Sequence, residues 1–313
     1  MLRVGKYGMK KRATIKKSAA ATTALKKLRS FLDPREPGLA YLLVRTWNNQ
    51  GKAITYKELR EAILAGEISA DLLDQWQQDY ARFVVKYMEP RWSESLEAGA
   101  KEQLVKYPDF NFDPMGDGVL TWTENRAAEF ITNCTNTQIE GLRAVVRQAA
   151  TLENMTVDQL ARAIRPMVGL TKQQSVANLK YYNKLIEKGA SPKKALDLST
   201  RYAAKQHRYR GYNIARTELA FSYNKGADLG IRQAQAAGYM GEMVKIWCTA
   251  DDERMCEYCD SLDGKRIAMD EEFDFYTKLQ YSNPGIRRTP PAHPSCRCTV
   301  MYEEVSPPIR RTY

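Results

Sequence analysis

The stretch PPAHPSCRC (residues 290–298), together with CEYC (residues 256–259), decides how the C-terminal part of this chain is expected to fold. The two stretches contain four of the six cysteines and one of the two histidines. A C-x-x-C turn brings two thiolates to one ion, and a second group of donors completes a tetrahedron around Zn²⁺. The spacing therefore predicts a metal site that joins two distant segments, which is feasible because loop-closure entropy grows slowly with loop length.

Five side chains are candidates for the four positions of such a site: Cys256, Cys259, His293, Cys296 and Cys298. We favour the first four, because residues 296 and 298 of an extended chain point to opposite sides. The main alternative replaces His293 by Cys298, and a further interpretation is that these are reduced thiols beside an unrelated histidine. Four protein ligands would make a closed, structural zinc site, whereas three would leave one position open for catalysis.

The residues before and between these stretches predict strands and turns. Glu242–Cys248 alternates, with Val244, Ile246 and Cys248 on one side of a strand and Met243, Lys245 and Trp247 on the other. In this pattern Cys248 is a small buried hydrophobe and not a ligand. Asp263-Gly264 predicts a tight turn, and residues 298–303 predict a closing strand.

Residues 31–205 read as mostly helical. Ser69 precedes an apolar stripe that runs from Leu72 to Met88, and Pro90 is expected to end or kink that helix. The loop PDFNFDPMGDG (residues 108–118) separates this part from further helices. Three capping boxes predict helix starts, at Thr121/Glu124, Thr156/Gln159 and Thr171/Gln174.

Two further signals follow along the chain. Gly189 is expected to end one helix, and Ser191-Pro192 to begin the next. Residues 208–237 then predict a long amphipathic helix. The fold class is therefore a mainly α N-terminal region followed by a small α+β C-terminal domain stapled by zinc. Its predicted parts are a flexible basic arm (1–30), a helical domain (31–205) and an α+β domain with the metal site (206–313).

The net charge of +11 is concentrated at one end of the chain. Residues 1–30 contain ten Lys and Arg and no acidic residue, whereas the other 283 residues carry 38 basic against 37 acidic side chains. This arm can be a solvated tail, a transit peptide or a segment that binds phosphates nonspecifically. Its candidate DNA-binding residues are Lys10, Lys11, Arg12, Lys16, Lys17, Lys26 and Lys27. Another basic group, Arg201, Lys205, Arg208 and Arg210, is a solvated face or a second phosphate contact.

Several protein classes are excluded. The mean hydropathy of −0.54 and the lack of a long apolar stretch argue against a membrane protein. P-loop, dinucleotide-binding, H-E-x-x-H and deaminase signatures are absent from the sequence. The cluster Asp251-Asp252-Glu253 can supply a general base if the metal site is open, but these acids fit more simply in the first turn of a short helix capped by Thr249.

The C-terminal third resembles the phage Mu protein F-like domain of tailed-phage head morphogenesis proteins. The resemblance rests on Arg216-Thr217-Glu218, on Trp247 and Asp252, and on the cysteine stretches, and it covers about residues 155–303. The role of Arg216, Thr217 and Glu218 in the family is unknown to us, and we expect a buried ion pair or a contact with the metal unit. Asp252 and Trp247 belong to the same family motif.

The resemblance implies a minor capsid protein with no enzymatic activity. Such a protein is a virion component that is made in the host cytoplasm and associated with the portal and with the major capsid or scaffolding protein. Some relatives are associated with DNA, which suits nonspecific contact between the basic arm and packaged double-stranded DNA. The alternatives are a zinc-dependent nuclease and a zinc-ribbon regulator that reads a DNA sequence. Copy number, partner surface, ejection with the DNA and host stay open.

Overall fold

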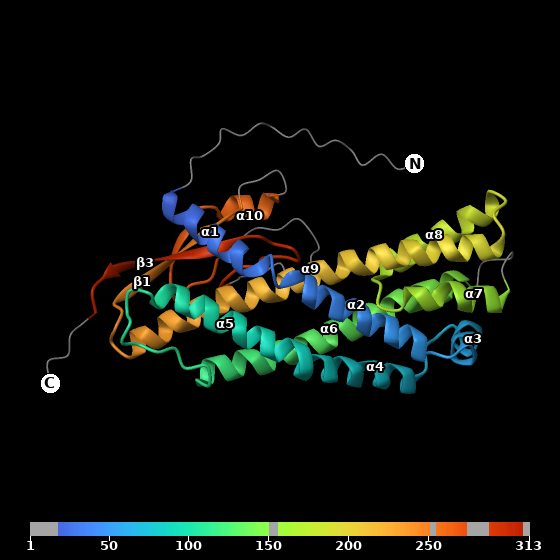
Figure 1. Cartoon of the computed structure of the whole chain (residues 1–313), viewed down its shortest axis with the longest axis horizontal. Helices are drawn as coiled ribbons and strands as arrows, with labels where there is room; N and C mark the ends of the chain where they lie inside the picture. The colour runs from blue at the N-terminus through green and yellow to red at the C-terminus, as the bar shows by residue number, and fades with distance from the viewer. Residues whose placement is uncertain (1–17, 150–155, 251–254, 274–287, 309–313) are drawn as a thin grey trace.

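The fold is known from a computed structural model that describes residues 18–149, 156–250, 255–273 and 288–308. In these residues helices predominate, and a three-stranded antiparallel sheet lies near the C-terminus (Figure 1). A mainly α chain that ends in a small α+β unit is therefore confirmed. In chain order the elements are α1 (Ala19–Leu32), α2 (Glu36–Ala53), α3 (Tyr56–Ala65), α4 (Ala70–Phe83), a π-helical turn (Val84–Met88), α5 (Glu89–Leu104), α6 (Asp117–Ala149), α7 (Val157–Ile164), a 3₁₀ turn (Arg165–Met167), α8 (Lys172–Glu187), α9 (Pro192–Ala236), β1 (Glu242–Cys248), α10 (Glu257–Leu262), β2 (Arg266–Ala268) and β3 (Thr299–Ser306).

Helix α9 is the longest element and runs through the whole body of the protein (Figure 1). Its 45 residues extend about 68 Å at about 1.5 Å per residue. The Ser191 side chain caps it by accepting a hydrogen bond from the backbone of Lys194, and Gly189, with φ of 83°, ends α8, both as predicted. The helix that begins at Pro192 and the amphipathic helix predicted for residues 208–237 are one continuous helix. The predicted division between residues 205 and 206 therefore lies inside one continuous helix.

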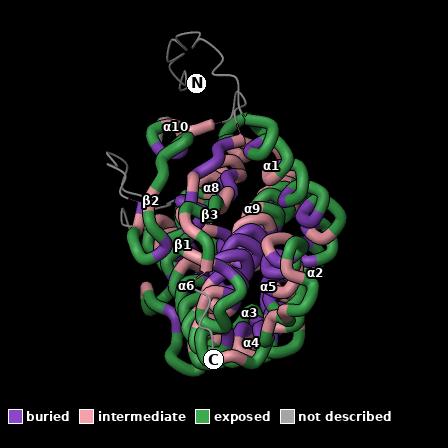
Figure 2. The backbone as a smooth tube through the Cα atoms, turned by 90° about the vertical axis from the view of Figure 1, so that its left-hand side faces the viewer, coloured by how far each residue is buried: buried purple, intermediate pink, exposed green. Residues whose placement is uncertain are grey.

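The burial of α9 explains why its amphipathic pattern predicted residues 208–237 and not the whole helix. Between Ala215 and Ile231 nearly every side is covered, and even the polar residues Glu218, Asn224 and Asp228 are buried. Figure 2 shows this buried centre, with α5 and β1 close to α9. A helix that is covered on all sides shows no single apolar face, so its periodicity is a weak guide to its length.

The contact between α5 and α9 requires residues without side chains. Gly99 of α5 faces the backbone of Tyr223, and Gly226 of α9 faces the backbone of Leu96. A Cβ atom added at either glycine would overlap a carbonyl oxygen of the opposite helix. The two helices can therefore approach this closely only while both positions are glycine.

The helix that follows Ser69 keeps its helical course past Pro90. Ser69 caps α4 as predicted, and the aromatic residues Trp76, Tyr80 and Phe83 are buried in the core. α4 ends at Phe83, a π-helical turn follows, and Pro90 lies in the first turn of α5. Proline is tolerated there because the first helical N–H groups have no intrahelical acceptor.

Two of the three predicted capping boxes are confirmed. Thr156 and Thr171 each accept from the backbone of the glutamine three residues later, and that glutamine binds back to the threonine N–H. The box at Thr121 is wrong, because α6 begins earlier, at Asp117, and Thr121 lies inside it. The predicted loop of residues 108–118 is confirmed up to the start of α6.

Strand β1 is the centre of the sheet, between β2 and β3. Met243, Lys245 and Trp247 form its fully buried side, so the predicted alternation of the strand is confirmed. Gly264, with φ of 74°, makes the predicted turn before β2, and the predicted closing strand is β3. Cys248 is buried as expected.

Helix α1 packs against this sheet, which changes the extent of the predicted arm. Ala21 and Leu25 of α1 form a small apolar cluster with Cys248, and Leu28 lies in the main core. Residues 19–30 are thus a helix that belongs to the folded body, whereas residues 1–17 lie outside the described part of the chain. No helix among the described residues has both the length and the apolar character that a membrane span requires.

We expect Gly226→Ala to destabilise the protein strongly. The added methyl group would push α9 away from Leu96, and overpacking of this kind costs about 1–3 kcal/mol or more. Gly38→Ala is the matched control, because it also lies in a helix but has no atom within 4 Å of an added Cβ. The control should be stabilised by about 0.5–1 kcal/mol. Urea unfolding followed by circular dichroism measures both, and equal stability of the two variants would contradict this packing.

Candidate metal centre

The first two candidate ligands are held by the start of α10. Cys256 is the N-cap of this helix, and its Sγ accepts a hydrogen bond from the backbone N–H of Cys259 at 3.4 Å. A cap of this kind requires extended backbone at Cys256 and helical backbone after it. The C-x-x-C spacing therefore turns both sulfur atoms toward the same side.

The other three candidates lie on the segment that leads into β3. Its bend is at Ser295, which has φ of 60°, an unusual value for a residue other than glycine. Two hydrogen bonds from this residue fix the bend on α9. The Ser295 N–H donates to Thr217 Oγ1 at 2.9 Å, and its hydroxyl donates to Asn213 Oδ1 at 2.7 Å. The long helix thus positions the segment that bears His293 and Cys296.

The fold brings all five candidates together in two overlapping groups. Cys256, Cys259 and His293 form one group, and Cys259, Cys296 and Cys298 form the other, with the ligand atoms of each group within 4.8 Å of one another. His293 Nε2 is 3.0 Å from Cys256 Sγ and 3.3 Å from Cys259 Sγ, and the Cys259 and Cys296 sulfur atoms are 3.6 Å apart. Cys259 is common to both groups, so this cluster can hold a metal ion.

The donor set fits a thiophilic metal such as zinc. Thiolate and imidazole are the donors of structural zinc sites, and no carboxylate belongs to either group found in the described residues. His293 is oriented for this role, because its Nδ1 is 2.9 Å from the Pro294 carbonyl oxygen. With the Nδ1–H donated there, Nε2 is left to face the two sulfur atoms, as in metal sites where a second partner fixes the tautomer.

The cluster is closed on one side by a small apolar core. Cys259, Cys296 and Cys298 are buried in it with Trp247, Leu262 and Phe273, while Cys256 and His293 are half-buried. The Trp247 and Phe273 rings meet edge to face with their centroids 5.0 Å apart. Trp247 therefore packs under the cysteines.

The electrostatics of the cluster favour a charged pair when no metal is present. The interaction with Cys259 and the contact with His293 lower the pKa of Cys256 to about 4, against the opposing effect of burial. The contact with Cys256 raises the pKa of His293 to about 9. At neutral pH the pair is thus a thiolate beside an imidazolium, and a metal ion has to displace the imidazolium proton.

Arg216, Thr217 and Glu218 each contact a different part of the protein. Arg216 forms a bidentate ion pair with Glu36 at the start of α2, with both N–O distances at 2.7 Å. Thr217 accepts the hydrogen bond from Ser295 described above. Glu218 is buried and pairs with Arg126 of α6, whose Nε donates at 2.8 Å. This one turn of α9 joins two helices of the body and the cysteine segment, so ion pairs and a contact with the metal unit both occur.

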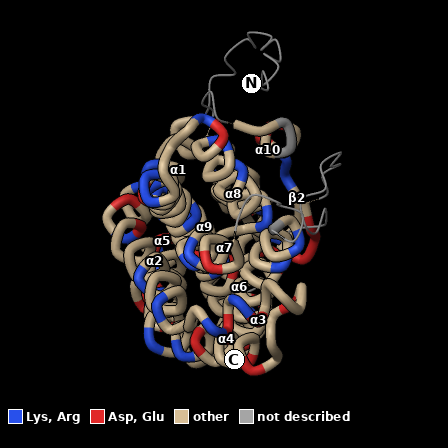
Figure 3. The backbone as a smooth tube through the Cα atoms, turned by 90° about the vertical axis from the view of Figure 1, so that its right-hand side faces the viewer, with Lys and Arg blue, Asp and Glu red and all other residues tan. Residues whose placement is uncertain are grey.

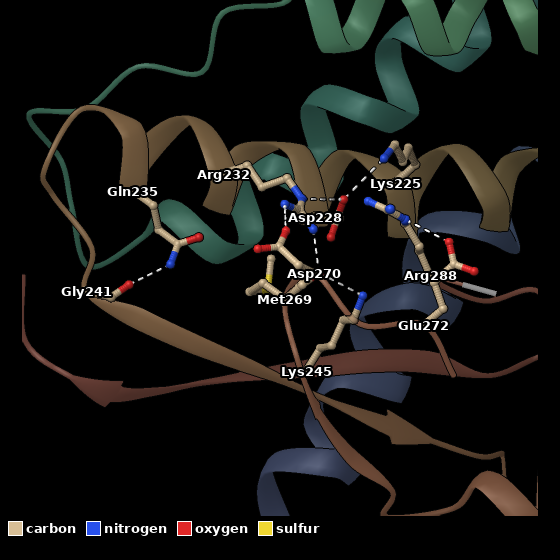
Figure 4. A network of polar contacts seen from close by, with 10 residues as sticks. All are labelled: Lys225, Asp228, Arg232, Gln235, Gly241, Lys245, Met269, Asp270, Glu272 and Arg288. Carbon is tan, nitrogen blue, oxygen red and sulfur yellow. Dashed lines mark hydrogen bonds and ion pairs between the residues drawn. The ribbon is translucent and has the colours of Figure 1, made fainter. Parts of the chain in front are cut away.

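A second polar network joins α9 to the sheet edge (Figure 4). Asp228 is fully buried and accepts from Lys225 and Arg232 at 3.2 Å each. Arg232 also pairs with Asp270 at 2.7 Å, and buried Lys245 donates to the Met269 carbonyl at 3.0 Å. Burial lowers the pKa of Lys245 to about 8. Sequence reasoning missed this network, because an alternating strand pattern does not reveal that a lysine lies on the buried side.

Other predicted residues lie apart from the cluster or outside the described part of the chain. Asp251, Asp252 and Glu253, with the helix that Thr249 was expected to cap, fall in the latter class, as do Lys10, Lys11, Arg12, Lys16 and Lys17. Lys26 and Lys27 lie on α1, and Lys27 pairs with Glu102. Asn213 and Ser295 were missed as positioning residues. The only signal for Asn213 is that it lies one helical turn before Thr217.

Comparison with known proteins finds one family. Residues 155–301 match the model of the family described as Phage Mu protein F like protein. The matched range begins just before α7 and includes Arg216, Thr217, Glu218 and all five candidate ligands. No curated protein and no solved structure matches the chain.

We expect metal binding at this cluster to release protons at neutral pH. The pKa of His293 is raised to about 9 in the absence of metal, so its proton must leave before Nε2 can bind. Apparent affinity for Zn²⁺ should therefore rise with pH up to about 9, by about tenfold per pH unit for each proton released. Calorimetric titration in buffers of different ionisation enthalpy measures the release. A binding heat that does not depend on the buffer would mean that no proton leaves the cluster, and would contradict binding by His293 together with the Cys259 thiol, whose pKa is also raised.

Proposed function

Since residues 155–301 match the model of the phage Mu protein F-like family, we propose that this chain is a structural component of phage heads that acts in head morphogenesis. The observation that carries the proposal is that two distant parts of the matched sequence, the long helix and the cysteine segment, are in direct contact. Thr217 from the long helix and Ser295 from the cysteine segment bind each other, so the matched sequence is one folded unit. That unit is joined to the helical body through Arg216 and Glu218.

The metal in this proposal is zinc, and its role is structural. Cys256, Cys259, His293 and Cys296 are the preferred ligands, and Cys298 in place of His293 is the alternative. Bound zinc would hold α10 to the segment before β3, which are otherwise separated by more than thirty residues. Four protein donors leave no position for a water molecule or a substrate, which supports a role without catalysis.

The nuclease alternative lacks a comparable basis in the described residues. A hydrolytic zinc site needs an open coordination position and a base beside it. The donors brought together here are thiols and one imidazole, and the acids at 251–253 lie outside the description. We therefore retain the structural role as the proposal.

The partners follow from the family and from the charge of the chain. We place the protein in the virion head after assembly in the host cytoplasm, bound near the portal and in contact with the major capsid or scaffolding protein. The five basic residues Lys10, Lys11, Arg12, Lys16 and Lys17 precede the first described helix, and we assign them to nonspecific contact with packaged double-stranded DNA.

Head assembly tests the proposed function. Portal, scaffolding and major capsid proteins of the same phage should be co-expressed with this chain, and the heads purified by sedimentation. Mass spectrometry should find the chain in heads that contain portal and should find it depleted from heads assembled without portal. Heads that exclude the chain under both conditions would contradict the proposal.

Loss of one central cysteine should abolish zinc binding and destabilise the sheet. Cys259 belongs to both groups of donors, so Cys259→Ser should remove the stoichiometric zinc. We expect a fall of more than about 4 kcal/mol in the free energy of unfolding of the C-terminal unit, the range seen when a structural metal is lost. Cys248→Ser is the control, since Cys248 is buried outside both groups. It should keep its zinc and lose about 1–3 kcal/mol. Elemental analysis and thermal unfolding measure both effects, and an equally stable Cys259→Ser protein would exclude a structural metal.

A further inference from the structure

Residues 31–313 are nearly neutral as a whole, but their charge is strongly polarised. Residues 172–216 contain 11 Lys and Arg against 2 Asp and Glu. The rest of residues 31–313 contains 27 basic against 35 acidic residues. Counting residues 31–313 together therefore hides a basic segment, which consists of α8 and the N-terminal half of α9. We call this pair of helices the basic hairpin.

The basic hairpin is a rigid unit. A short connection joins its two helices, which pack side by side in opposite directions. The Asn178 side chain donates to the Ser199 carbonyl at 3.2 Å and to Gln206 at 3.1 Å. The rings of Tyr181 and Tyr202 meet at a centroid distance of 5.2 Å. Charges on this unit are therefore held in fixed relative positions.

Nine of the eleven basic side chains are exposed. The two exceptions are used inside the fold: Arg210 is buried and donates to the Gly169 carbonyl, and Arg216 pairs with Glu36. In the described part of the chain, one of the nine, Arg201, forms an ion pair, with Asp197 at 3.2 Å. The exposed residues are Lys172, Lys180, Lys184, Lys188, Lys193, Lys194, Arg201, Lys205 and Arg208.

Seven of the nine exposed cations lie on one continuous face, whereas Lys172 and Lys193 lie about 180° from the two tyrosines. Successive helical residues are rotated by about 100°, so Lys184 and Lys188 lie within about 60° of Tyr181. Lys205 lies about 60° and Lys194 about 80° from Tyr202. Because the two tyrosines contact each other, the cations of both helices flank the same line. From Lys194 to Arg208 the face is about 21 Å long.

We propose that the basic hairpin binds the phosphate backbone of double-stranded DNA without sequence preference. Duplex DNA carries about one negative charge per 1.7 Å of its axis, so a straight basic face of this length meets many phosphates. Seven of the nine cations are lysines, which bind phosphate as point charges and do not require the paired geometry of a base contact. That the polyanion is DNA rests on the proposed function, whereas the basic face itself does not.

The position of the basic hairpin suits this role. It lies at the end of the molecule away from the sheet and α10 (Figure 1), and Figure 3 views the molecule from that end with basic and acidic residues coloured. The face is therefore separate from the metal centre. DNA bound there would leave the sheet end free for other contacts.

Salt-dependent binding to a mixed-sequence DNA duplex tests this inference with the full-length chain. The hairpin variant carries Lys184→Gln, Lys188→Gln, Lys194→Gln and Lys205→Gln, all exposed positions. The matched control removes the same charge elsewhere, by Lys52→Gln, Lys86→Gln, Lys106→Gln and Arg143→Gln. The slope of log affinity against log salt should fall by up to about 3.6 in the hairpin variant, because each phosphate contact contributes about 0.9. The control should keep the wild-type slope, and equal slopes in the two variants would overturn the inference.

Three further measurements separate the possible outcomes. A variant with Lys→Arg at the same four hairpin positions keeps the charge and should retain DNA binding. If this variant also fails to bind DNA, the weaker binding of the Gln variant comes from misfolding and not from the lost charge. An arm variant with Gln at positions 10, 11, 12, 16 and 17 tests the arm alone. A reduced slope in that variant, with a wild-type slope in the hairpin variant, would overturn the inference and leave the proposed function intact. Sedimentation of each variant tests whether the basic hairpin instead binds acidic residues of a second copy of this chain. A hairpin variant that self-associates less but binds DNA as the wild type does would also overturn the inference.

Discussion

The hydrogen bond between Thr217 and Ser295 is the contact on which the arrangement of the C-terminal half depends. It joins the middle of the longest helix to the segment that carries three of the five candidate metal ligands. Without it, among the described residues, the hydrogen bond to Asn213 would be left to hold the bend at Ser295, with its positive φ, on α9. A backbone conformation of this kind persists when the surrounding contacts over-determine it. The helix therefore acts as the template on which the cysteine cluster is assembled.

The same turn of α9 also holds the helices of the body together, because its consecutive side chains point in different directions. Side chains at consecutive helical positions are about 100° apart, so Arg216, Thr217 and Glu218 necessarily face three different surroundings. In this protein those surroundings are α2, the cysteine segment and α6. The buried pair of Glu218 with Arg126 would be costly to break, since one uncompensated charge would stay in the core. One turn thus couples the metal centre to the packing of distant helices.

Metal binding and DNA contact are proposed for opposite ends of this helix, and the physics of the two ends differs. Near the sheet α9 is surrounded on all sides, and its polar side chains are paired within the fold, as Asp228 is with Lys225 and Arg232. In its N-terminal half α9 is covered on one side, and its other side carries cations exposed to solvent. A helix that is continuous from one end to the other keeps these two regions at a fixed distance.

Features that depend on neighbours within a few residues could be predicted from the amino-acid sequence. The capping boxes at Thr156 and Thr171, the Ser191-Pro192 helix start, the alternation of β1 and the C-x-x-C turn all belong to this class. Each depends on hydrogen bonds or side-chain directions that the local backbone sets. The box at Thr121 failed for the same local reason, because the helix had already begun at Asp117.

Which distant groups meet became known from the folded structure. It showed that Cys259 belongs to both donor groups, that Lys245 is buried and donates to the Met269 carbonyl, and that residues 19–30 form a helix that packs on the sheet and the core. It also showed that the exposed cations of residues 172–216 lie along one hairpin, whereas the net charge of residues 31–313 conceals them. These contacts join residues that are tens to hundreds of positions apart. Sequence spacing cannot predict them, because they depend on how whole helices pack.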